Sequence, residues 1–306
     1  MPRRSSRGLG LSQLGGAGER YHVGAESGNP RFTDRGGPKM AWRYGEMPTF
    51  TQPHEVLAAT ANIAHSISQA SPGERAHGEQ WYPKVHEAVS KGIRKRGFLS
   101  GASDKMLTGS ALVAAVSPNM DWDKNNIGAF KELASLKSSH WAAINRGDKS
   151  PVAGMSINAA TVSNLQKAGR LIAGADPNAE LHQGRAPKTH SFMHNISNPS
   201  DPGYVTIDGR AFDTMTNRMR SWEVNRGLTG GASMNKRYTA GRNIWQAVAG
   251  DMGIHPSAAQ AISWSHTKYD LEQTGRTRKQ GPNRTGQPYF HPETGAPALH
   301  AGQFGR

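Results

Sequence analysis

Two residues of this sequence, Lys188 and Asp208, carry groups that could together do chemistry on a nucleotide. They stand 20 positions apart, in the stretches GRAPKT at residues 184–189 and VTID at residues 205–208. An uncharged amine can attack the C1′ carbon of a sugar and form an imine. A carboxylate can stabilise the oxocarbenium-like charge that develops there and can shuttle protons. Such a pair could expel a base from its sugar.

The residues just before Lys188 are small. Gly184 and Ala186 stand between a helix that we expect to end near Leu181 and a helix that we expect to begin near Lys188. In such a helix–turn–helix, small residues let a partner approach the backbone, and the amides in the first turn of the second helix can bind a phosphate. We therefore expect Gly184, Arg185 and Ala186 to contact DNA.

At these residues the sequence resembles the helix-hairpin-helix DNA glycosylase superfamily, which includes endonuclease III and the 8-oxoguanine glycosylases. The hairpin of that family reads Gly-x-Gly-x-Lys; Gly184 and Lys188 match it, and Ala186 replaces the second glycine. The family also has an aspartate in a Val-Asp-Thr-His-like segment farther along the chain, which Asp208 matches. Here residues 207–210 read Ile-Asp-Gly-Arg, so the histidine of the family is absent.

A second match lies upstream, at residues 112–126, which read LVAAVSPNMDWDKNN. This stretch looks like the family's Leu-Leu-Ser-x-Gln segment, with Ser117 in place of the serine and Asn119 in place of the glutamine that is inserted into the duplex. The resemblance covers roughly residues 105–270. The order of the segments around Trp81 and residues 259–264 also resembles that of phage-encoded relatives in the same superfamily.

The resemblance implies an all-α, glycosylase-like helical core that binds double-stranded DNA. It implies that Lys188 is the Schiff-base nucleophile, that Asp208 is the catalytic carboxylate, and that Asn119 fills the gap left by a flipped base. It implies no cofactor except a monovalent cation, which backbone carbonyls of the hairpin hold in such folds. Because the chain has no cysteine, it cannot carry the Cys-ligated iron–sulfur cluster of endonuclease III.

Each of these residues also has a structural interpretation, which the sequence leaves open. Lys188 could be a solvated residue at a helix end, and Asp208 could cap the helix that starts at Arg210. Asn119 could likewise cap the helix that follows it. Packing in a helical core is the alternative role for the aromatic residues Trp81, Tyr82, Trp122 and Trp264.

The charge of the chain indicates a polyanionic partner. Lys and Arg number 37 and Asp and Glu number 23, which leaves a net charge of +14 and a pI near 10.2. An excess of this size is most often matched by nucleic acid. One basic cluster lies at the end of a predicted helix, where we expect DNA contacts from Lys91, Arg94, Lys95 and Arg96. A second run extends from Arg276 to Arg284, and both could equally be solvated surfaces.

Several classes of protein and site are excluded or disfavoured. The absence of cysteine excludes disulfides, thiolate zinc sites and cysteine nucleophiles. No apolar run approaches the roughly 20 residues that span a bilayer, so we expect no membrane-spanning protein. His190 and His194 have i,i+4 spacing but no third ligand nearby, so we expect no metal site. We expect a cytoplasmic monomer, in the host-cell cytoplasm if the protein is phage-encoded.

The composition divides the chain into three parts. Residues 1–47 and 273–306 are basic and rich in Gly and Pro, and we predict that they form a disordered arm and a disordered tail. Residues 48–272 are predicted to form one helical, glycosylase-like domain. Apolar spacing predicts helices over residues 56–67, 81–93, 106–116, 125–136, 158–173, 189–196, 210–223, 236–252 and 257–269. Strand character is confined to residues 204–207, too few for a sheet, so the predicted fold class is all-α.

The leading prediction for function is a DNA glycosylase, with AP-lyase activity supplied by Lys188. One alternative is a glycosylase-fold, pyrophosphorylase-like transferase that modifies thymine-type bases in phage DNA. Another is a non-catalytic DNA-binding module in which Lys188 and Asp208 are structural. The sequence does not identify the base, because base specificity depends on a pocket assembled from separated helices.

Overall fold

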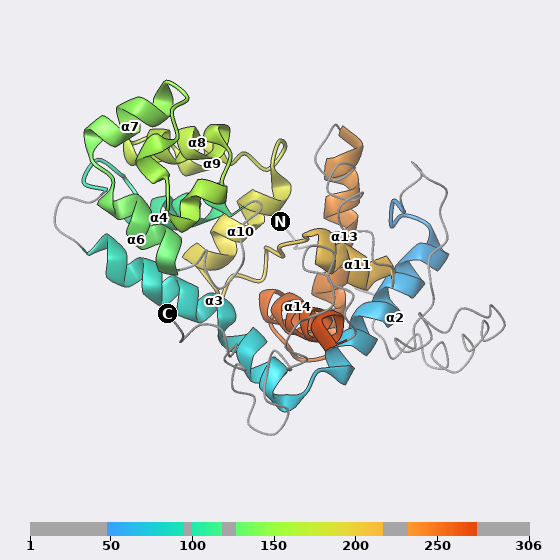
Figure 1. Cartoon of the computed structure of the whole chain (residues 1–306). Coiled ribbons are helices and arrows are strands. Elements are labelled where there is room, and N and C mark those ends of the chain that lie inside the picture. The colour runs from blue at the N-terminus through green and yellow to red at the C-terminus, as the bar shows by residue number, and fades with distance from the viewer. Residues whose placement is uncertain (1–47, 95–98, 118–126, 217–231, 274–306) are drawn as a thin grey trace, which may run out of the picture. The chain divides into compact units, whose positions relative to one another are not determined.

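The computed structural model describes residues 48–94, 99–117, 127–216 and 232–273 (Figure 1). Every regular element in these ranges is a helix, and none of them is a strand, so the predicted all-α class is confirmed. The chain forms two compact units. Among the described residues, the central unit is the stretch Trp81–Thr206, and the terminal unit combines residues 48–80 with those from Ile207 onward.

The central unit is built around α4 (Lys105–Val116). Its residues Thr108–Val116 are all buried, because this stretch is apolar or small on every side. α6 (Ile127–Ser135), α8 (Val162–Ile172) and α10 (Pro187–Ser197) pack against it (Figure 1). Such burial on all faces is the usual position of a helix that lacks a polar stripe.

The remaining helices of the central unit lie around this core. They are the second part of α3 (Pro72–Ile93), α7 (Ser138–Asn145) and α9 (Pro177–Glu180), with short 3₁₀ turns at Ser150–Val152 and Ser156–Ala159. Since α3 begins at Pro72 and the unit boundary follows Gln80, this helix contributes residues to both units.

The predicted helix over residues 158–173 was wrong at its start. The hydroxyl of Thr161 accepts a hydrogen bond from the Asn164 amide at 3.2 Å, so it caps α8 and the helix begins at Val162. Ala159, predicted on the buried face, lies in a 3₁₀ turn and is exposed. The predicted stop is confirmed, because Gly174 follows the helix with φ of +97°, where glycine carries no steric cost.

The terminal unit combines α2 (Pro53–Gln69) and the start of α3 with α11 (Gly209–Thr216), α13 (Ala232–Asp251) and α14 (Pro256–Gln273). α2 packs against the other three full helices (Figure 1). Gly78 of α3 lies so close to α14 that an added Cβ would stand 2.5 Å from the backbone nitrogen of Ile262. The core is filled by large, fully buried side chains that include Ile63, Ile67, Phe212, Trp245 and Ile262.

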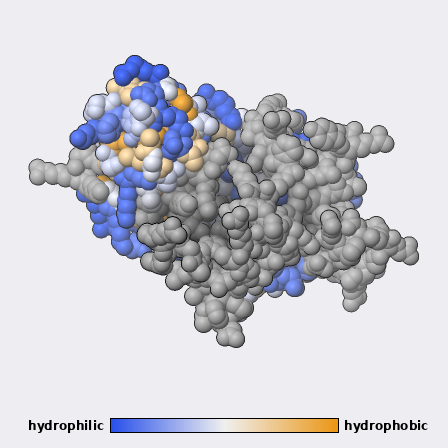
Figure 2. Space-filling view, in the orientation of Figure 1, coloured by the Kyte–Doolittle hydropathy of each residue, from blue (hydrophilic) through white to orange (hydrophobic). Residues whose placement is uncertain are grey.

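Figure 2 shows the surface of part of the central unit. In Figure 2 the upper left, where Figure 1 places α7 and α8, is mostly hydrophilic with small hydrophobic spots between. No helix in the described ranges is both long enough and apolar enough to cross a bilayer. The predicted arm and nearly all of the predicted tail lie outside the described residues.

Candidate functional site

A helical hairpin carries Lys188. The carboxylate of Asp176 caps α9 by accepting from the Asn178 amide at 3.0 Å, and α9 ends after one turn, at Glu180. The chain then turns through residues 181–186, and α10 begins at Pro187. Pro187 suits the first helical position because that amide has no helical partner. Lys188 is therefore the second residue of α10, and the predicted helix start near Lys188 is confirmed.

The amides of the turn bond within the turn. His182 Nδ1 accepts from the Gly184 amide at 3.0 Å. The His182 carbonyl accepts from the amides of Arg185 and Ala186 at 3.0 and 2.9 Å. No side chain caps the start of α10, so the amides open to a phosphate are those of its own first turn. Gly184 does not have positive φ, so the conformation itself does not require glycine there.

The side chains of Arg185 and Lys188 in the hairpin differ in whether they bond to other residues of the protein. Arg185 is exposed, and its Nη2 donates to the Ala179 carbonyl at 2.8 Å, so this guanidinium folds back on α9. Lys188 is partly exposed and makes no hydrogen bond or ion pair with any residue that the structure describes. Its amine is therefore available to a ligand.

Two histidines of α10 hold the hairpin together. His190 Nδ1 donates to the Leu181 carbonyl at 3.0 Å, and His194 Nε2 donates to Asn178 Oδ1 at 3.1 Å. The His194 ring also stacks on Tyr204, with centroids 4.2 Å apart and an angle of 6°. Burial lowers the pKa of His190, and burial together with nearby His190 lowers the pKa of His194 to about 4. Both imidazoles are therefore neutral at pH 7.

The histidine pair is thus explained by hairpin packing. Across the described ranges, no group of three His, Cys, Asp or Glu side chains could hold a metal ion.

Asp208 lies in the terminal unit, at the start of α11. Its Oδ1 accepts from the Ala211 amide at 2.8 Å, and its carbonyl accepts from the Phe212 amide at 2.9 Å. These two bonds make it the N-cap of α11, which is the structural role that the sequence left open. The bond uses Oδ1, and the carboxylate is partly exposed.

Arg210 follows Asp208 after one residue. Its guanidinium carbon lies 4.8 Å from the centroid of the Trp264 ring, in cation–π geometry. Its buried Nη1 has no hydrogen-bond partner in the described part of the chain. A buried guanidinium nitrogen without an acceptor favours binding of an anionic group.

The predicted site residues lie in different parts of the structure. Gly184, Arg185, Ala186 and Lys188 come together in the hairpin, while Asp208 belongs to the other unit. Lys91 and Arg94 are exposed at the end of α3, where Lys91 pairs with Glu87. The remaining predicted contacts, Lys95, Arg96 and Asn119, lie outside the described residues.

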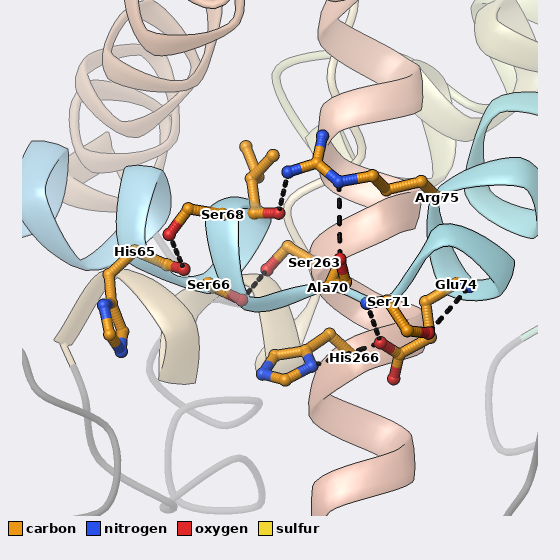
Figure 3. A network of polar contacts seen from close by, with 10 residues as sticks. His65, Ser66, Ser68, Ala70, Ser71, Glu74, Arg75, Ser263 and His266 are labelled. Carbon is orange, nitrogen blue, oxygen red and sulfur yellow. Dashed lines mark hydrogen bonds and ion pairs between the residues drawn. The ribbon is translucent and has the colours of Figure 1, made fainter. Parts of the chain in front are cut away.

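A polar network at the corner between α2 and α3 was not predicted from the sequence (Figure 3). The Ser71 amide donates to Glu74 Oε2 at 2.7 Å, and the Glu74 amide donates to Ser71 Oγ at 3.3 Å. This is a capping box, and its signal is the sequence Ser-Pro-Gly-Glu at residues 71–74. The Arg75 guanidinium donates to the carbonyls of Ile67 and Ala70, so it caps the C-terminal end of α2.

α14 joins this corner through further polar contacts. Glu74 Oε2 accepts from His266 Nδ1 at 3.4 Å, and the hydroxyls of Ser66 and Ser263 are 2.9 Å apart (Figure 3). Burial raises the pKa of Glu74, but the hydrogen bonds from His266 and Ser71 outweigh burial and hold it below its ordinary value. The network fixes helix ends, so its buried carboxylate has a structural explanation.

The fold and the hairpin define an all-α protein that places a lysine at the start of a helix after a tight turn. A model of a protein family, described as "Family of unknown function (DUF7178)", matches residues 47–269. The match covers most of the chain, so the chain belongs to the DUF7178 family. No curated protein and no solved structure matches it significantly.

Proposed function

We propose that the protein is a DNA base-excision enzyme, a DNA glycosylase with AP-lyase activity. The observation that carries this proposal is the place of Lys188. It follows the hairpin turn directly, at the uncapped start of α10, and its side chain is partly exposed with no partner among the described residues. A nucleophilic amine beside amides that can bind a phosphate suits attack on a sugar in the DNA backbone.

In the proposed reaction the Lys188 amine attacks C1′ of a flipped nucleotide, and the bond from C1′ to the base breaks. The base leaves with the bonding electrons and takes up a proton, and the opened sugar forms an imine with Nζ. Loss of a proton from C2′ then expels the 3′ phosphate by β-elimination, and water releases the enzyme. Asp208 stabilises the positive charge at the sugar and moves protons, while the Ala211 amide orients its carboxylate.

We propose that the hairpin backbone and basic side chains of the protein bind the DNA duplex. Gly184 and Ala186 let a strand approach the hairpin, and Arg185 adds a cation at its edge. Lys91 and Arg94 at the end of α3 add positive charge, to which Lys95 and Arg96 contribute as the next residues in the sequence. Asn119 fills the gap left by the flipped base. The net charge of +14 supports such contacts.

Borohydride trapping tests the proposal. Duplexes carrying an abasic site or one of a panel of altered bases are incubated with the protein and reduced, which fixes any imine as a covalent adduct. We expect an adduct for the wild type and none for Lys188→Ala. Lys167→Ala is the matched control, because Lys167 is also a partly exposed lysine on a helix of the central unit. An adduct that survives Lys188→Ala, or none with any duplex, contradicts the lyase mechanism.

A second candidate is the pyrophosphorylase-like transferase that modifies thymine-type bases. The unpartnered Nη1 of Arg210 favours it, because this guanidinium could bind the phosphates of an activated base. Mass spectrometry of nucleosides from treated DNA separates the candidates: excision releases a free base, and modification leaves a heavier nucleoside. Salt-sensitive DNA binding without either product leaves the non-catalytic module, in which Asp208 only caps α11.

A further inference from the structure

Two arginines of the terminal unit each have a buried guanidinium nitrogen without an acceptor. Arg210 Nη1 in α11 and Arg242 Nε in α13 are both buried and have no hydrogen-bond partner. Neither side chain forms a hydrogen bond or an ion pair with any residue that the structure describes. A buried guanidinium nitrogen without an acceptor costs free energy, so each arginine offers a strong donor to an anion.

Arg237 provides a comparison on the same helix as Arg242. Arg237 is also partly buried, but its Nε donates to the Pro48 carbonyl at 2.8 Å. Packing within the terminal unit therefore explains Arg237. It does not explain Arg242, five residues later, because a buried cation without a partner destabilises the fold. The missing partner of Arg242 points to a ligand.

Contacts between α11 and α13 bring the positions of the two arginines together. The Ile207 amide donates to Tyr238 OH at 3.0 Å. A Cβ added at Gly241 would stand 3.1 Å from Ile207 Cδ1. Arg242 follows Gly241 directly, and Arg210 is the second residue of α11, three positions after Ile207. The start of α11 therefore packs against the turn of α13 that carries Arg242.

Two tryptophans accompany the two arginines. The Trp264 ring holds the Arg210 guanidinium in cation–π geometry, which leaves the edge of the guanidinium available to an acceptor. Trp245 lies three residues after Arg242, on the same face of α13, and its fully buried Nε1 has no partner either. All three unpartnered atoms are donors and two of them belong to cations, so the complementary ligand is an anionic acceptor.

We propose that Arg210 and Arg242 bind a phosphate group in the terminal unit. A phosphate offers several acceptor oxygens together with negative charge, and a guanidinium can donate two parallel hydrogen bonds to it. The phosphate belongs either to the DNA backbone or to a free nucleotide. This inference goes beyond the proposed function, because it needs neither Lys188 nor the excision of a base.

Calorimetric titration with pyrophosphate at constant ionic strength tests the site. We expect the wild type to bind, and Arg210→Gln and Arg242→Gln each to weaken binding by about tenfold or more, because each removes a charged donor. Lys236→Gln is the matched control, since it removes the same charge from an exposed lysine of α13. It should leave the Kd nearly unchanged. The inference is overturned if the wild type does not bind, if acetate binds as tightly as pyrophosphate, or if all three variants bind equally weakly.

Thermal unfolding without phosphate separates a ligand site from a structural role. Arg242→Met keeps much of the side-chain length and removes a buried charge without a partner, so it should leave the Tm unchanged or raise it. Arg237→Met should lower the Tm, because it removes the hydrogen bond to the Pro48 carbonyl. If both variants lower the Tm equally, Arg242 is structural and the inference is wrong.

Binding of a DNA duplex to the same variants identifies the source of the phosphate. If Arg242→Gln weakens DNA binding as it weakens pyrophosphate binding, and pyrophosphate competes with DNA, the site binds a backbone phosphate. If only pyrophosphate binding is weakened, the site binds the phosphate of a free nucleotide. Both results support the site. Neither requires a covalent adduct at Lys188, so failure of borohydride trapping would overturn the proposed function alone.

Discussion

Asp208 caps α11 with one carboxylate oxygen, and asparagine can make the same hydrogen bond. Asp208→Asn should therefore change the free energy of unfolding by less than about 0.5 kcal/mol, whereas Asp208→Ala should lower it by about 1 kcal/mol. If the carboxylate also stabilises charge at the sugar, Asp208→Asn should reduce single-turnover excision by at least about 100-fold. Thermal unfolding and single-turnover assays measure the two effects separately.

Asp104 provides a matched control for this substitution. It caps α4 by accepting from the Leu107 amide at 2.8 Å, which is the same bond over the same sequence separation. Asp104→Asn should leave both stability and excision unchanged. Full excision by Asp208→Asn would restrict Asp208 to the capping role and favour the non-catalytic module.

Residue placement was predictable where it depended on local chain geometry. Lys188 follows a proline that suits the first position of a helix, and Gly174 ends a helix with positive φ. The internal bonding of the hairpin turn was not predictable in this way. It depends on His182, whose ring and carbonyl accept hydrogen bonds from the amides of the turn. No rule of residue spacing predicts that a histidine will have this role.

At the scale of elements, the α9–α10 hairpin should be sensitive to acid through His194. Its pKa falls from 6.5 to about 4, so between these values the unfolded chain binds a proton that the folded hairpin excludes. The free energy of unfolding then decreases as the pH falls from 6.5 toward 4. We expect a loss of about 1–2 kcal/mol, less than the full shift because the side chain is partly exposed.

His194→Phe tests this pH dependence. Phenylalanine can keep the stack on Tyr204 but does not titrate, so the variant should lose less stability than the wild type between pH 7 and pH 4.5. Denaturant unfolding at both pH values gives the comparison, and the difference between the proteins removes the contribution of Glu74. Equal losses in both proteins would contradict the role of His194.

The close packing of α3 against α14 in the terminal unit depends on Gly78. Gly78→Ala would place a Cβ 2.5 Å from the Ile262 nitrogen, and a backbone atom cannot rotate away, so α3 and α14 must separate. We expect a loss of about 2–3 kcal/mol, despite the better helix propensity of alanine. Gly250 of α13 is the control, since a Cβ there meets nothing within 4 Å. Gly250→Ala should stabilise by up to about 1 kcal/mol in the same denaturant assay.

Elements with a long apolar stripe were predictable, and short ones were not. α2 follows from its apolar spacing and α4 from its continuous apolar run. The eight-residue α7 buries only Trp141 and Ile144 and gives no period to detect. The start of α8 was misplaced because Ala159 continues the apolar period into a turn. There the cap at Thr161 decides the boundary, and periodicity does not report it.

At the scale of the whole molecule, the net charge of +14 should make the proposed DNA binding strongly salt-dependent. Affinity for a random duplex should fall by at least about 100-fold between 50 and 200 mM salt. If Arg94 contacts a phosphate, Arg94→Ala should reduce the slope of log K against log salt by about 1. Fluorescence anisotropy titrations at several salt concentrations measure that slope.

Arg170→Ala is the control for the slope. Arg170 is already paired with Glu180 through two hydrogen bonds of 2.7 and 2.8 Å, so its charge is compensated within the protein. Its removal should leave the slope unchanged. If both variants reduce the slope equally, binding follows overall charge and the end of α3 is not a distinct contact.

The grouping of helices into units could not be read from the sequence. Periodicity shows which face of α2 is apolar, but any apolar face of matching size could cover it. The structure assigns that face to α11, α13 and α14, which are far away along the chain. Residues 48–272 are predicted as one domain, because local sequence patterns carry no information on such distant pairing.

The terminal unit has a consequence for folding during synthesis. α2 ends at Gln69 and α11 begins at Gly209, 140 residues later. At a translation rate of about 5–20 residues per second, about 7–28 s pass between the synthesis of α2 and that of α11, the first helix that covers its apolar face. The central unit, one continuous stretch, can fold in that interval. A ribosome-bound chain halted before Ile207 would thus hold a folded middle and a helix with exposed apolar residues, the state that chaperones bind.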